Sequence, residues 1–203
     1  MQPDPTLAAH SQHFAMDVKK SALSYDAISF GPYQVANIDL DWGRSSSARS
    51  GSFTQSRSTK DYAYTVSSAG TSLNVKCKYK KETSGASLSG MSLGGHKVSL
   101  HCDLSRADAV DGAFDLRSAD NGYAGEAKAK ERTFAVASRH AVVGGTTSSP
   151  AGYDVRAGDN VLAEVQTVNE PEVWLDTAAP ADDAIAAAAI VVAVYFFERE
   201  ANR

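Results

Sequence analysis

The sequence predicts a mainly β protein, a closed antiparallel β-barrel of about ten to twelve strands around a buried hydrophobic C-terminal helix. Three observations lead to this fold class. Most of the chain alternates apolar and polar residues, turn-forming residues separate the alternating runs, and the last apolar segment has no polar face. A helix that is apolar all round must be enclosed all round, and a large closed barrel can hold one.

The N-terminal segment, residues 1–22, shows no clear alternation. We expect it to form an arm, loose or with a short helix, that precedes a single barrel domain over residues 23–203. Residues 44–60, RSSSARSGSFTQSRSTK, are rich in serine and are predicted to form a long mobile loop.

Three segments alternate strongly enough to predict half-buried strands: VANIDLDW (35–42), LNVKCKYKK (73–81) and KVSLHCDL (97–104). In each, the apolar residues are expected to face inward, which in the first segment places Ala36, Ile38, Leu40 and Trp42 inside. Weaker patterns predict further strands, bounded by turn signals such as SAG, LGG and DNG. These weaker strands are residues 62–66, 113–118, 123–128, 133–138, 152–156, 160–168 and 172–176.

The C-terminal segment is predicted to form the central helix, over about residues 181–199. Ala184–Phe197 contains no polar group except the Tyr195 hydroxyl, and Asp182 and Asp183 suit the N-terminal end of a helix. As a strand, this run would be about 46 Å long, well beyond the usual length. As a helix it is about 21 Å long, which is short for a membrane span.

A barrel closed around a C-terminal hydrophobic helix resembles the tubby-like superfamily. That superfamily joins tubby C-terminal domains, phospholipid scramblases and LURP-one-related proteins. The most similar stretch is GYDVRAGDNVLAEVQ, Gly152 to Gln166, with a strand, a turn, a second strand and then the run into the helix. The cysteine-rich stretch of scramblases and the phosphoinositide-binding pattern of tubby domains are missing here. The resemblance therefore implies the fold and carries over no lipid-contacting residue.

The two cysteines, Cys77 and Cys102, both fall in the inward phase of their strands. If the strands pair as an antiparallel hairpin whose partner numbers sum to 179, Cys77 faces Cys102 and all the apolar residues share one face. A cross-strand disulfide is then sterically feasible, and two buried free thiols are the alternative. A disulfide would favour an oxidising compartment such as the cell envelope.

Basic residues form the strongest surface feature. Three lysines share the polar phase of the strand around Cys77, so they should stand outside in a row about 6.6 Å apart. The serine-rich segment adds cations without any acidic residue. Together these residues form a candidate anion site for lipid headgroup phosphates, although lysines that shield a solvated strand give the same pattern. The candidate residues are Lys76, Lys78, Lys80, Lys81, Arg44, Arg49, Arg57 and Lys60.

Other chemistry finds little support in the sequence. His10 and His13 lack further ligands at metal-binding spacing, and Asp39 and Asp41 lack the cleft that a catalytic carboxylate pair needs. We therefore expect no enzymatic activity, no cofactor and no metal. The acidic pI of about 5.7 argues against nucleic acid as a partner.

The function that these observations favour is non-enzymatic binding or scaffolding at a membrane surface or in the cell envelope. The expected partner is an anionic phospholipid or another protein. The alternative is a small hydrophobic-ligand carrier, in which the helix lies outside and the barrel lumen is free.

Overall fold

The computed structural model describes residues 1, 3–21, 24–41, 43–88, 91–107 and 109–201. In this part of the chain, two helices and sixteen strands follow one another. They are α1 (Pro5–Ala8), β1 (Ser11–Ala15), β2 (Asp17–Lys20), β3 (Tyr25–Phe30), β4 (Tyr33–Leu40), β5 (Arg44–Ser50), β6 (Phe53–Ser68), β7 (Thr71–Leu88), β8 (Met91–Arg106), β9 (Ala109–Ala119), β10 (Gly122–Ala129), β11 (Arg132–Arg139), β12 (Ala141–Val142), β13 (Gly145–Thr146), β14 (Gly152–Ala157), β15 (Asn160–Gln166), β16 (Glu172–Asp176) and α2 (Ala181–Ala201).

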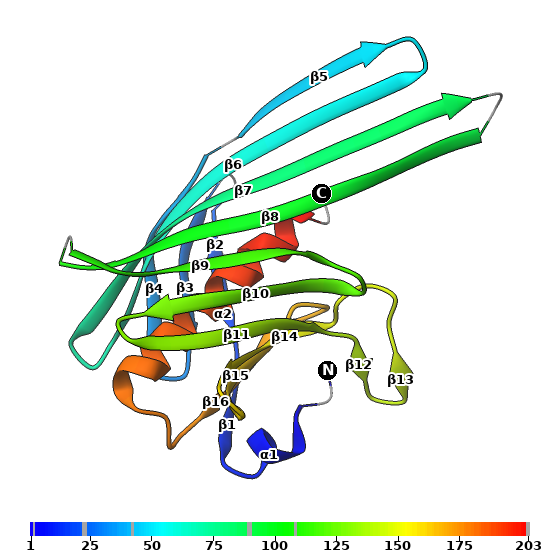
Figure 1. Ribbon diagram of the computed structural model, residues 1–203. Coiled ribbons are helices and arrows are strands. Elements are labelled where there is room, and N and C mark those ends of the chain that lie inside the picture. The colour runs from blue at the N-terminus through cyan, green and yellow to red at the C-terminus, as the bar shows by residue number, and fades with distance from the viewer. Residues whose placement is uncertain (2, 22–23, 42, 89–90, 108, 202–203) are drawn as a thin grey trace.

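One antiparallel sheet curls into a nearly closed barrel (Figure 1). Its strands are neighbours in the order β1-β16-β15-β14-β11-β10-β9-β8-β7-β6-β4-β3-β2, while β5 lies off this path and pairs with β6. The short strands β12 and β13 form a separate hairpin. The predicted fold class is confirmed, with thirteen strands along the barrel path instead of ten to twelve.

The N-terminal segment completes the barrel wall. β1 pairs with β16 at one end of the strand path, and β2 pairs with β3 at the other end. Only Met16 separates β1 from β2, and its N–H donates to the Pro171 carbonyl at 2.9 Å. The expectation of a separate arm over residues 1–22 therefore needs correction, because residues 11–20 bridge the seam of the sheet. The expected short helix in this segment is present as α1.

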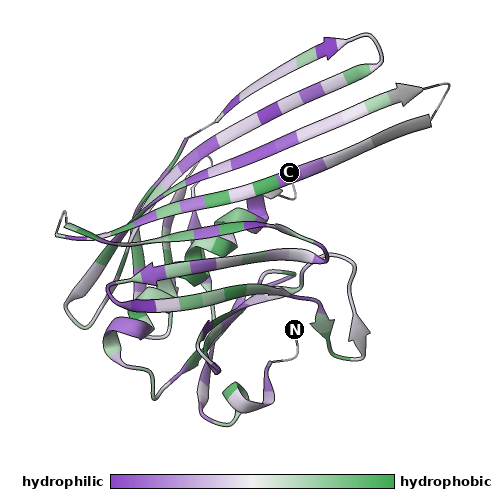
Figure 2. Cartoon of the chain, in the orientation of Figure 1, coloured by the Kyte–Doolittle hydropathy of each residue, from purple (hydrophilic) through white to green (hydrophobic). Residues whose placement is uncertain are grey.

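The helix α2 lies inside the barrel, and Figure 2 shows that most of its residues are hydrophobic and that strands surround it. Every residue from Ile185 to Phe197 is at most 2 % exposed. The hydroxyls of Tyr62 and Tyr64, on β6, donate to helix carbonyls at Ala193 (3.0 Å) and Ala189 (2.7 Å). The predicted central helix is confirmed. The side chains of α2 fill the lumen. The ligand-carrier alternative placed this helix outside an empty barrel, and the structure does not have that arrangement.

Charged residues fix both ends of α2. In its first turn, Asp182 accepts hydrogen bonds from Lys130 and Arg106, each at 2.6 Å. These bonds lower the pKa of Asp182, so the carboxylate stays charged beside the positive end of the helix dipole. In its last turns, Tyr153 donates to the buried carboxylate of Glu198, and Lys60 forms an ion pair with Glu200.

The predicted alternation is confirmed along β7 and β8, whose inward residues are buried. In β4 it changes phase, and the expectation that Ala36 faces inward is wrong. Ala36 is exposed and Val35 is buried, because the register with β6 shifts between Ala36 and Asp39. Asn37 has a φ of 52°, a left-handed conformation that asparagine tolerates and that β-bulges use. Trp42 lies outside the described residues.

Cys77 and Cys102 form a disulfide inside the barrel wall. They are direct partners in the antiparallel pair of β7 and β8, in the register whose numbers sum to 179. Their Cα atoms are 4.0 Å apart, close to the short spacing of non-hydrogen-bonded pairs.

Four strands extend beyond the barrel as an arm, seen at the top right of Figure 1. We define the arm as residues 44–60 and 80–97, because β4 first pairs with β6 at Tyr62 and β9 with β8 at Ser99. The predicted mobile loop over residues 44–60 is wrong, since β5 and the start of β6 form a regular hairpin there. Its serine and threonine side chains face solvent on both sides, so the sequence shows no apolar alternation.

Candidate functional site

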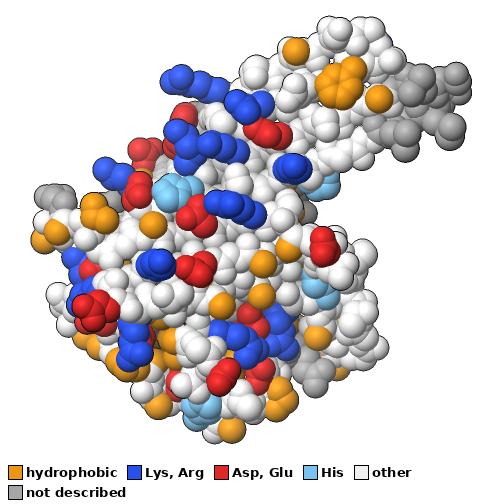
Figure 3. All heavy atoms as spheres, viewed as in Figure 1, with side chains coloured by type: hydrophobic (Ala, Val, Ile, Leu, Met, Phe, Trp, Pro, Cys, Tyr) orange, Lys and Arg blue, Asp and Glu red, His pale blue; other side chains and the backbone are white. Residues whose placement is uncertain are grey.

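Five of the eight candidate cations share the outer face of the sheet, the face turned away from α2. Lys76, Lys78 and Lys80 stand exposed in a row along β7, as predicted. Arg57 on β6 and Arg44 on β5 lie on the same face, because cross-strand partners share a face. Arg44 is the partner of Thr59, which is the partner of Lys80, and Arg57 lies two residues from Thr59 on the same strand. Figure 3 shows Lys and Arg side chains gathered over this region, with acidic side chains among them.

The other three candidates lie on the inner face. Lys60 pairs across strands with Tyr79, whose ring is buried against the helix, and Lys81 pairs with Val98, which is also buried. Arg49 belongs to that face by the same alternation. The predicted patch is thus divided between two faces of the sheet. The expectation of one loop folding near β7 failed because residues 44–60 continue the sheet, so that neighbouring residues point to opposite sides.

One row across five strands contains cations and hydroxyls and no carboxylate. It consists of cross-strand partners on β5, β6, β7, β8 and β9, and we call it the Lys80 row: Arg44, Thr59, Lys80, Ser99 and Arg117. Four interstrand steps of about 4.8 Å give the row a span of about 19 Å. Ammonium, guanidinium and hydroxyl groups are the donors that bind phosphate oxygens.

The rows on either side contain acids, and one of these, Asp115, also lies 3.9 Å from the guanidinium of Arg117 in the Lys80 row. Toward the barrel, His101 contacts Asp115, with Nδ1 and Oδ1 3.1 Å apart, and Lys78 lies between His101 and Asp61. Toward the arm, Arg57 donates to Glu82 at 2.8 Å. The Lys80 row therefore differs from the two rows beside it in having cations and no carboxylate of its own.

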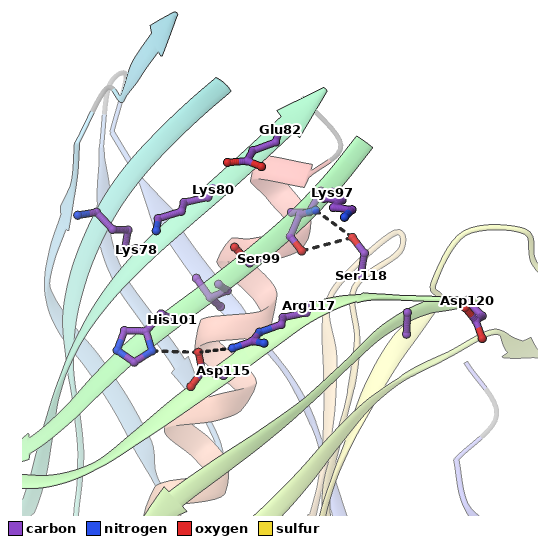
Figure 4. Close-up of a pocket in the computed structure, with 13 residues that line it drawn as sticks. Lys78, Lys80, Glu82, Lys97, Ser99, His101, Asp115, Arg117, Ser118 and Asp120 are labelled. Carbon is purple, nitrogen blue, oxygen red and sulfur yellow. Dashed lines mark hydrogen bonds and ion pairs between the residues drawn. The ribbon is translucent and has the colours of Figure 1, made fainter. Parts of the chain in front are cut away.

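A groove of about 860 Å³ lies over β7, β8 and β9 beside the Lys80 row. Figure 4 shows Lys80, Lys97 and Arg117 around Ser99, whose short side chain leaves space between them. In the described part of the chain, Lys80 and Lys97 have no ion-pair partner. The groove thus brings together these two lysines and Arg117, which lies 3.9 Å from Asp115 in the groove lining.

Sequence reasoning missed three residues of this groove, Lys97, Ser99 and Arg117. The predicted β7–β8 register already placed Ser99 opposite Lys80, so that residue was within reach of the sequence. Arg117 required the pairing of β8 with β9, whose register shifts between Leu104 and Ser105. Lys97 begins the predicted strand over residues 97–104, and the same register places it opposite Glu82, so it too was within reach of the sequence.

The histidines considered as ligands make local contacts. His13 stacks on Trp174, with ring centroids 4.7 Å apart, and its Nε2 lies 3.6 Å from Glu172. His10 Nε2 lies 3.7 Å from Asp176. Among the described residues, no group of three or more histidine, cysteine or acidic side chains is arranged to hold a metal ion.

A second charged cluster lies beneath the N-terminal segment, on the outer side of β14 and β15. Glu164 is fully buried, accepts from Arg139 at 2.7 Å and accepts from the backbone N–H of Asp4. Burial raises the pKa of Glu164 above its ordinary value, against the opposing effect of Arg139. Hydrogen bonds from Thr6 lower the pKa of Asp4 to about 2. These contacts fasten the N-terminal segment to the barrel wall.

Comparison of the chain with protein-family models, curated proteins and solved structures finds no match. Of the helices that the structure describes, none is long and apolar enough to cross a membrane.

Proposed function

We propose that this protein is a non-catalytic binding or scaffolding protein that docks on an anionic membrane surface. The observation that carries the proposal is the acid-free Lys80 row beside the open groove. Lipid headgroup phosphates are the ligand that its mixture of cations and hydroxyls fits. We extend the proposal to a tubby-like relationship, which the enclosed C-terminal helix supports as architecture.

The proposed location is the cell envelope or another oxidising compartment. The disulfide between Cys77 and Cys102 supports this location, because such bonds persist outside reducing compartments. The filled lumen argues against the carrier alternative, since a carried hydrophobic ligand would have to displace side chains of α2.

Vesicle co-sedimentation tests the proposed function. We expect the protein to sediment with vesicles containing phosphatidylserine and to remain in solution with neutral phosphatidylcholine vesicles. The double variant Lys80→Glu/Arg117→Glu should reduce the bound fraction at least tenfold, because each substitution reverses a charge in the Lys80 row. Binding should also weaken as salt increases.

The matched control is Lys128→Glu, a charge reversal at an exposed position of β10 on the same wall. We expect this variant to bind vesicles almost as well as the unchanged protein. Equal binding by the double variant and the unchanged protein would rule out the Lys80 row as the lipid site. Inorganic phosphate that competes with vesicles at low concentration would instead identify a soluble phosphate as the ligand.

A further inference from the structure

β5 is the outermost strand of the arm, and one of its two edges is unpaired within the described chain. β5 pairs with β6 along its whole length, and no other described strand pairs with it. Figure 1 shows β5 at the margin of the arm. An unpaired strand edge offers N–H and C=O groups that can pair with another extended chain.

The turn after β5 tells which backbone groups face that edge. Gly51, with a φ of 58°, and Ser52 form a two-residue turn between Ser50 and Phe53. The residues that flank such a turn form a hydrogen-bonded pair, and hydrogen-bonded and non-hydrogen-bonded pairs then alternate along the hairpin. The even-numbered residues of β5 therefore bond to β6. The N–H and C=O groups of Ser45, Ser47 and Arg49 face the open edge.

This edge lacks the features that usually block strand pairing. It contains no proline, its register with β6 has no bulge, and all seven residues are exposed. Its charges are Arg44 and Arg49, with four uncharged residues between them. The centre of the edge is thus open to a partner strand.

The charge of the arm indicates what kind of chain fits there. The arm contains seven Lys and Arg residues and a single acid, Glu82, which forms an ion pair with Arg57. The rest of the chain contains 13 Lys and Arg against 23 Asp and Glu, so positive charge is concentrated on the arm. A second arm of the same kind would be repelled, whereas an acidic strand would be attracted.

We propose that the open edge of β5 binds an extended acidic segment of another protein by strand addition. Arg44 lies on the outer face and Arg49 on the inner face, about 17 Å apart along the strand. A matching segment has two carboxylates five residues apart, one on each face. Main-chain hydrogen bonds to the edge supply affinity, and the two arginines select for acid. This interaction uses the β5 edge and Arg44 at the end of the Lys80 row, and it leaves Lys80 and Arg117 available for lipid.

Fluorescence anisotropy with the full chain and a labelled peptide tests the proposal. The probe is the octapeptide Thr-Glu-Val-Thr-Val-Thr-Glu-Thr, whose glutamates are five residues apart. We expect saturable binding, at least tenfold weaker for Arg49→Glu. Ser47→Pro should abolish binding, because it removes an N–H that faces the edge without removing a bond to β6. Arg117→Glu is the charge-matched control and should leave peptide binding within twofold.

Three outcomes would overturn the proposal. One is equal binding of a peptide with the same sequence whose alternate amides are N-methylated, because charge alone would then explain the affinity. Another is equal binding of a peptide with lysines in place of the glutamates. The third is dimerisation in sedimentation that Ser47→Pro abolishes, since the edge would then belong to a second copy. Arg117→Glu lowers only vesicle binding and Ser47→Pro only peptide binding, so failure of one function is distinguishable from failure of the other.

Discussion

The hydroxyls of Tyr62 and Tyr64 fasten the barrel wall to the axis of the enclosed helix. Both side chains are buried, and both donate to main-chain carbonyls of α2. Burial raises the pKa of each phenol well above its ordinary value, since a phenolate there would lose its solvation. Neutral phenols are therefore part of the folded state.

Alkaline titration should show this dependence. In the unfolded chain these phenols ionise near pH 10, while in the folded protein they hold their protons, so stability is complete below pH 10 and falls as pH rises above it. None of the eight tyrosines, all of which lie within the described residues, is exposed, and we expect Tyr62 and Tyr64 to titrate only together with loss of circular dichroism. In Tyr62→Phe/Tyr64→Phe the decline of the melting temperature above pH 10 should be shallower. An unchanged slope in this variant would contradict the role assigned to the two phenols.

At single positions, prediction from sequence succeeded wherever strict alternation held. Cys77 opposite Cys102 followed from the requirement that all the apolar residues of two strands share one face. It failed at Ala36, because a bulge at Asn37 adds a residue and nothing in the local pattern signals it. The faces of Arg49 and Lys60 were missed because their segment was predicted to be a loop, to which alternation does not apply.

At the scale of elements, the β7–β8 hairpin combines a covalent link with a long ladder. The disulfide joins residues separated by 25 positions in the sequence. A loop of this length constrains the unfolded chain enough to contribute about 3–4 kcal/mol to the free energy of unfolding.

Cys77→Ala/Cys102→Ala tests that contribution without leaving a single reactive thiol. Urea denaturation should give a free energy of unfolding lower by about 3–4 kcal/mol. Reductant should lower the stability of the unchanged protein and leave the variant unaffected. Two free thiols in the denatured, unreduced protein would show that the bond does not form.

The elements that the sequence did not reveal share a physical feature. β5 has both faces in solvent, so it needs no apolar side chains and gives no period-two signal. β1 and β2 are short. β1 is held by pairing with β16, far away in the sequence, and β2 continues directly from β1 and pairs with β3. Local patterns identify strands that have a buried face, and they miss strands that are defined by their neighbours.

At the scale of the whole molecule, a basic arm projects from an acidic barrel whose interior is filled by α2. Filling of the lumen by a helix could be predicted, because a 14-residue apolar run without a polar face has to be enclosed on all sides. Closure of the barrel by the N-terminal segment and projection of the arm could not, because both depend on the lengths and registers of strands. The candidate site was predicted only in its β7 part for the same reason.

Hydrogen–deuterium exchange, read residue by residue, tests most directly whether the helix is the core of this molecule. We expect the amides of residues 186–194 to be among the slowest to exchange, at rates set by global unfolding and equal to those of the barrel strands around Val75 and Val165. The contrary result is that helix amides exchange much faster than the amides of these strands while the sheet remains protected. That result would show that the sheet stays folded when the helix opens, and it would contradict the central role of the helix in the core.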